Sequence, residues 1–130
     1  WLGCVLTEVL FERALLGKGR AQEALLADLH RRVDLFVELP AFVLVAASGA
    51  LMLNGSAGGV WLHAKIGFGL IAIAANGYCV RLVLARAQAA QDGRWEDFAW
   101  IDARQHRWGA VVLVAMLVAI VLGMTRLNVL

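Results

Sequence analysis

Hydrophobic residues occur along this chain in long runs, and short segments rich in glycine and polar residues separate them. The breaks are GKGR at 17–20, NGSAGG at 54–59 and DGR at 92–94. Runs of this length exceed a buried strand, and glycine clusters between them mark turns. The pattern predicts four helices, at about residues 1–16, 21–53, 60–90 and 95–127.

The second predicted helix has two different halves. Its first half is amphipathic, with apolar residues recurring at helical spacing, whereas residues 35–53 are almost wholly apolar. Pro40 is the only proline in the chain. Proline cannot donate a backbone hydrogen bond and clashes with the preceding turn. We therefore expect the helix to be perturbed there and the carbonyl of Phe36 to be released.

Composition indicates whether these helices are surrounded by water or by lipid. Of the 130 residues, 62% are hydrophobic and 17% are charged, and the mean hydropathy is +0.74. Soluble domains average about 45–50% apolar and roughly 25% charged residues. The chain is therefore predicted to be one all-α domain, an integral membrane four-helix bundle. Because Trp1 already begins an apolar stretch, we expect the first spanning helix to be cut at its start, with residues missing before Trp1.

The distribution of basic residues predicts how the helices are oriented across the membrane. Ten of the twelve lysines and arginines lie at or between the inner ends of adjacent helices. They are Arg13, Lys18, Arg20, Arg31 and Arg32 in one group, and Arg81, Arg86, Arg94, Arg104 and Arg107 in the other. The positive-inside rule predicts up-down topology in the inner membrane, with both groups cytoplasmic and the C-terminus outside. Helices two to four would extend past the cytoplasmic face.

The same end of the predicted bundle holds an unusual set of ionisable residues. Acids and histidines recur at four-residue intervals, which places them near one face of a helix. The six candidates are Glu8, Glu12, His30, Asp34, Glu38 and His106. Asn76 is predicted to lie at the depth of Glu8 and Glu38, and Asp102 to lie further toward the cytoplasm, with His30. Ionisable groups inside a membrane are costly and normally face the bundle interior.

Three interpretations of this set remain open. Carboxylates and imidazoles inside a four-helix bundle are typical ligands of iron, manganese or zinc. Alternatively, the acids form a salt-bridge network, which the sequence modestly favours, and the expected partners are Arg13, Arg81, Arg104 and Arg107. Glu8, Glu38 and Asn76 could instead form part of a proton or ion path.

His63 and Lys65 form a second candidate site at the opposite end of the third helix. His63 is either a copper or haem ligand, or an interfacial histidine beside a lysine that reaches toward the headgroups. The stretch WLHAK at 61–65, after a WLGC-type first helix and a proline-containing second one, resembles the copper-resistance D family and the J-type protoporphyrinogen oxidases. That resemblance implies haem binding and makes His63 and Lys65 candidate cofactor-binding residues.

The sequence therefore predicts a small inner-membrane protein whose acid and histidine cluster binds metal or haem, with iron, copper or haem as candidate cofactors. The alternatives are a non-catalytic accessory subunit of a larger membrane complex and a proton or ion translocation component. Expected partners are the lipid bilayer and either other membrane subunits or further copies of the chain, and nothing points to nucleic acid. Whether the protein is an enzyme stays undecided, because no phosphate loop, C-x-x-C pair or G-x-S-x-G elbow is present.

Overall fold

The computed structural model describes residues 1–53 and 59–126, and within these ranges it contains helices and no strands. The elements are α1 (Leu2–Leu15), α2 (Arg20–Val33), the π-helical turn η1 (Asp34–Glu38), α3 (Leu39–Leu53), α4 (Val60–Gln91) and α5 (Trp95–Arg126). The predicted all-α class is thus confirmed. Because α2, η1 and α3 follow one another without a break, they form one long rod, as expected for residues 21–53.

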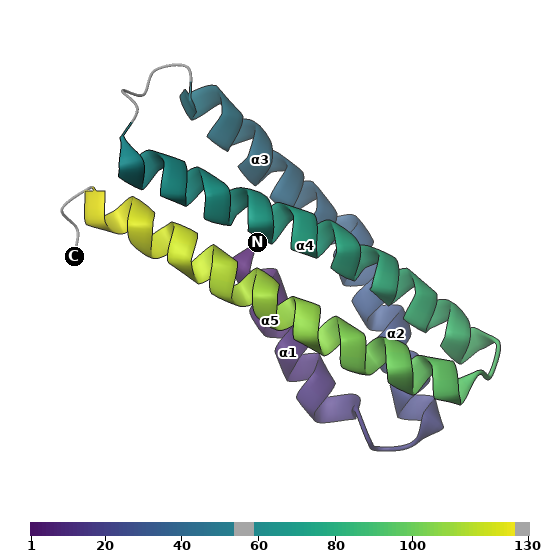
Figure 1. Cartoon of the computed structure of the whole chain (residues 1–130). Helices are drawn as coiled ribbons and strands as arrows, with labels where there is room; N and C mark the ends of the chain where they lie inside the picture. The colour runs from purple at the N-terminus through teal and green to yellow at the C-terminus, as the bar shows by residue number, and fades with distance from the viewer. Residues whose placement is uncertain (54–58, 127–130) are drawn as a thin grey trace.

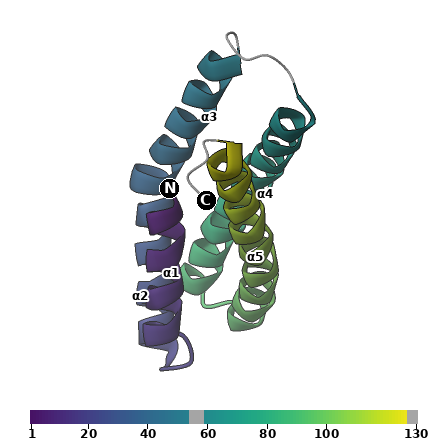
Figure 2. The ribbon, with the colours of Figure 1, turned by 90° about the vertical axis from the view of Figure 1, so that its left-hand side faces the viewer.

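Consecutive rods run in opposite directions, so the bundle is up-down (Figures 1 and 2). The α1–α2 connection and the tight turn between α4 and α5 lie at the same end of the molecule. Glycines with positive φ stand in both connections, Gly17 and Gly19 in the first and Gly93 in the second. Glycine ends helices in this conformation at little steric cost. The polar breaks at 17–20 and 92–94 thereby become tight connections of the bundle, whereas residues 54–58 of the third predicted break lie outside the described residues.

The perturbation expected at Pro40 takes the form of the η1 turn immediately before it. The amide of Leu39 donates to the carbonyl of Asp34, five residues earlier, where an α-helix would use the residue four earlier. Proline at position 40 cannot donate to the Phe36 carbonyl, so the widened turn lies where the regular pattern is already interrupted. Asp34 and Glu38, at the two ends of η1, are both buried.

Among the described residues, three helices are long and apolar enough to cross a membrane, at 20–53, 60–91 and 95–125. The first helix, α1, has 14 residues and is not among them. None of the residues of α3 is buried, and large side chains such as Leu44 and Leu51 are strongly exposed. A helix that is apolar on all sides and unburied in the isolated chain is typical of a segment that faces lipid.

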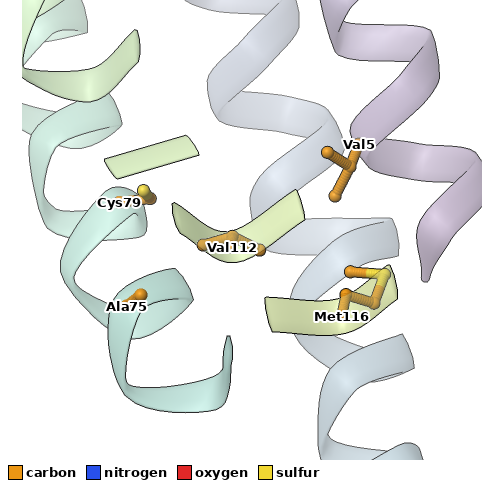
Figure 3. Packing of buried hydrophobic residues seen from close by; sticks show 5 residues of the cluster. All are labelled: Val5, Ala75, Cys79, Val112 and Met116. Carbon is orange, nitrogen blue, oxygen red and sulfur yellow. The ribbon is translucent and has the colours of Figure 1, made fainter. Parts of the chain in front are cut away.

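Two small apolar clusters hold the helices together. Figure 3 shows the first, in which Val5 of α1 meets residues of α4 and α5. Its buried members are Val5, Ala75, Cys79, Val112 and Met116. The second consists of Ala27, Ala87, Ala89 and Phe98. Along α1, α4 and α5, polar residues follow or lie between these cluster positions. The two apolar clusters therefore bracket a buried polar layer, and that layer contains the candidate site.

Candidate metal centre

All six residues selected from the sequence line one cavity of about 240 Å³. Glu8 and Glu12 come from α1, the rod containing α2 and η1 supplies three more, and His106 comes from α5. Asn76 and Gln105 complete its polar wall. Glu8, Glu12, His30, Asp34 and Glu38 are buried, whereas His106 is exposed. Residues far apart in the chain thus converge on one interior site, as the four-residue spacing suggested.

His30 lies at the centre of the cluster and is only 4% exposed. It shares the buried face of the amphipathic α2 helix with Leu26 and Ala27, at three- and four-residue spacing. Its Nε2 atom lies 3.1 Å from Oε2 of Glu8, and its Nδ1 atom lies 3.1 Å from Oε1 of Glu12. One imidazole therefore links both acids of α1.

Arg86 is the cation of the site, and it is completely buried. Its NH1 group donates to Oε1 of Glu12 at 2.8 Å and also to Oδ1 of Asp102. Its NH2 group lies 2.6 Å from Nδ1 of His30. The guanidinium also lies over the ring of Phe98, with Cζ 5.7 Å from the ring centroid. Arg86 therefore joins α4 to α1, α2 and α5 through charge-assisted bonds.

The arginine partners expected from the sequence were wrong. The four arginines assigned to neutralise the acids are all exposed, and none of them pairs with an acid of the site in the described part of the chain; they are Arg13, Arg81, Arg104 and Arg107. The physical reason is the rotation of each helix about its axis. Arg86 lies on the buried face of α4 and reaches the site, whereas the other arginines lie on outward faces.

Carboxyl groups outnumber basic side chains in this layer. Five carboxyl groups, those of Glu8, Glu12, Asp34, Glu38 and Asp102, surround or adjoin the cavity, and Arg86 is their single arginine partner among the described residues. The indole Nε1 of Trp1 donates to Oε1 of Glu38 at 2.7 Å, which satisfies one oxygen without supplying charge. Glu8 also interacts with the carboxyl groups of Asp34 and Glu38. Such a group of buried acids needs additional positive charge, from protons or from a cation.

Two sets of side chains have ligand atoms within 4.8 Å of one another. One is Glu8, His30 and Asp34, and the other is Glu12, Asp102 and His106. Arg86 already donates to both acids of the second set. Each set has one buried carboxylate oxygen without a hydrogen-bond partner, Oε1 of Glu8 in the first and Oε2 of Glu12 in the second, but every residue of the first set is buried whereas His106 of the second is exposed. The first set is therefore the better candidate for a bound cation.

His63 and Lys65 do not join this cluster. Both are exposed and neither lines the cavity. Nδ1 of His63 lies 2.9 Å from the carbonyl oxygen of Gly59, at the start of α4. The side chain of Lys65 lies against Gly123 of α5. Their role in binding a cofactor stays a prediction.

Two buried polar residues of the site were missed, Arg86 and Gln105. Arg86 follows Ala72 and Cys79 at seven-residue intervals, and all three are buried on one side of α4. Gln105 lies seven residues from both Phe98 and Val112, and these are buried on α5. Seven residues make almost two helical turns. This repeat was the signal that would have placed both residues inside the bundle.

No family model, no curated protein and no solved structure matches this chain. The resemblance carried by WLHAK therefore stays a prediction, and the functional argument depends on the geometry of the cluster.

Proposed function

We propose that this chain is an integral inner-membrane protein that binds a divalent metal ion through Glu8, His30 and Asp34. The proposed site lies in the cytoplasmic half of the bundle. The reason is that the basic residues gather at the helix ends nearest the site, and the positive-inside rule makes that side cytoplasmic. Glu38 is available as a further oxygen ligand, since only its Oε1 atom is occupied by Trp1.

The observation that carries the proposal is the excess of buried carboxyl groups over basic side chains around the cavity. Placing a carboxylate in the hydrocarbon region costs at least ~2.5–3.5 kcal/mol unless it is compensated. Arg86 compensates Glu12 and Asp102. It does not reach the carboxyl groups of Glu8, Asp34 and Glu38. A divalent cation among these three would supply the missing charge and use the unpaired Oε1 atom of Glu8.

The donor set favours particular metals. Carboxylate oxygens with one imidazole nitrogen suit iron, manganese or zinc better than copper(I), which prefers thiolate and thioether ligands. The Nε2 atom of His30 would bind the metal, because it faces Glu8. For Nδ1 to carry the ring proton and donate it to Glu12, 3.1 Å away, the NH2 group of Arg86 would have to move back from its present distance of 2.6 Å to Nδ1. A carboxylate that accepts from the second nitrogen orients the ring and strengthens it as a ligand.

Metal stoichiometry after purification in mild detergent tests the proposal. The wild-type chain, supplied with iron, manganese and zinc in turn, should retain about one ion per chain of at least one of them. His30→Ala and Asp34→Asn should each weaken binding at least about tenfold, as loss of a first ligand or its orienting partner does. His63→Ala and Asp28→Asn are the matched controls, because both positions lie outside the cavity. A folded wild-type chain that retains none of the three metals would refute the assignment.

Proton storage is the second candidate function. It is favoured by the interaction of the Glu8 carboxyl group with those of Asp34 and Glu38, because neighbouring buried acids can share protons. Infrared spectroscopy separates the two cases. A protonated-carboxyl band that survives metal addition and disappears in Asp34→Asn would support proton storage. A band that disappears when metal is added would support the metal site.

A further inference from the structure

Three exposed arginines, Arg81 on α4 and Arg104 and Arg107 on α5, are not among the residues that line the cavity. The guanidinium of Arg104 lies over two aromatic rings, with Cζ 5.8 Å from the centroid of Tyr78 and 5.2 Å from that of Trp100. Tyr78 in turn packs edge-on against Trp108, with centroids 5.1 Å apart. Contacts of this kind hold a guanidinium in place while leaving its N–H groups available.

These arginines have no acidic partner within the described residues. Arg107 follows Arg104 by one helical turn, and Arg81 follows Tyr78 by one turn. All three arginines are exposed, and none of the ion pairs of the described chain includes them. The acids nearest in sequence are engaged elsewhere, since Asp102 accepts from Arg86 and Asp97 accepts from Arg94. This face therefore carries uncompensated positive charge.

An apolar groove of about 350 Å³ runs between the same two helices. It is lined by Phe68, Ile71, Ala110, Val111, Val114 and Ala115. Ile71 precedes Tyr78 by seven residues, and Val111 follows Arg104 by seven. Seven residues are almost two turns, so each pair lies on the same side of its helix, and the axial separation is about 10 Å. The groove therefore begins about 5 Å along α5 from Arg107 and about 10 Å from Arg104, in the direction of the bilayer centre.

We propose that this face binds one anionic phospholipid. The phosphate would lie between Arg104, Arg107 and Arg81, and an acyl chain would lie in the groove between α4 and α5. The dimensions agree, because half of a hydrocarbon core is about 15 Å thick and the groove lies within that depth below the charges. Charge complementarity selects the headgroup, since clustered arginines beside a membrane helix attract lipids with net negative charge. The proposal does not depend on the metal site.

Native mass spectrometry in a non-ionic detergent provides the test. The wild-type chain should bind phosphatidylglycerol at least about fivefold more tightly than phosphatidylcholine with the same acyl chains. Arg104→Gln should remove most of that preference, and Arg104→Lys should retain more of it because the charge remains. Arg107→Gln, at an exposed side chain that makes no ion pair or ring contact within the described residues, should lower the preference without removing a contact that holds the helices together. Arg32→Gln is the control of equal charge change, because Arg32 is exposed and pairs with Asp28.

Further measurements distinguish the arginines that would bind the headgroup from the groove that would hold the acyl chain. Val111→Trp should fill the groove and weaken both lipids without changing their ratio. Inorganic phosphate should fail to displace phosphatidylglycerol, because it lacks the acyl chain. The proposal is overturned if the wild-type chain binds both lipids equally. It is also overturned if Arg32→Gln lowers the preference as much as Arg104→Gln, or if inorganic phosphate displaces the lipid at comparable concentration.

Discussion

Replacing Arg86 by methionine tests the buried network most directly. Methionine has a similar length and adapts its shape to the space available, so the change removes mainly charge and hydrogen bonds. Arg86 is fully buried, and its partners Glu12 and Asp102 have side-chain exposures of only 10% and 13%. The variant leaves both carboxyl groups without their cation in a site that water reaches poorly.

The expected loss of stability is large. Removing one partner of a buried ion pair typically costs about 3–5 kcal/mol, because the remaining charge stays desolvated and unpaired. Here one guanidinium serves two carboxylates and also contacts His30. The metal-free Arg86→Met chain should therefore lose at least that much free energy of unfolding. Adding Glu12→Gln and Asp102→Asn should restore more than half of the loss, since neutral amides remove the uncompensated charge.

Denaturation in mixed micelles, with a chelator present, measures these differences. Arg94→Met is the matched control, because Arg94 also pairs with two acids, Asp92 and Asp97, but is about half exposed. Water screens such pairs, so this variant should change stability very little. The reasoning is refuted if Arg86→Met destabilises no more than Arg94→Met. It also fails if the triple variant is less stable than Arg86→Met alone.

Two further outcomes are expected. Ala89→Leu should destabilise the fold by about 1–3 kcal/mol through overpacking, because Ala89 is fully buried against the cluster containing Phe98; Ala85→Leu, at an exposed position of the same helix, should be nearly neutral in the same denaturation assay. In a cysteine-free background, Lys18→Cys should react with an impermeant thiol reagent only from the cytoplasmic side and Val60→Cys only from the outer side; the reverse pattern would refute the proposed orientation.

The candidate site was largely predictable from local patterns. Four-residue spacing placed Glu8 with Glu12, and His30 with Asp34 and Glu38, on single helix faces. The high cost of ionisable groups in lipid then required those faces to point inward. Both arguments use only neighbours along one helix, so they need no knowledge of how the helices pack. The structure brings all of these residues to one cavity.

The partners of those acids were not predictable in the same way. Arg86 is separated from Glu12 by 74 residues and from His30 by 56. In the sequence, Arg86 belongs to the same basic group as Arg81, Arg104 and Arg107. What distinguishes Arg86 from these three is the direction in which its side chain faces. That direction depends on the rotation of α4 and α5 about their axes within the bundle.

Within the described residues, the sequence by itself determined the helices, the turns at 17–20 and 92–94, and the presence of helices apolar enough to cross a membrane, because these follow from hydrophobic periodicity and from glycine and proline positions. The tertiary structure alone decided which cation meets the buried acids, and therefore which carboxyl groups remain uncompensated. The physical reason is that a charge pair forms between helices. Its existence depends on interhelical distance and rotation, and no single segment of the sequence encodes either of them.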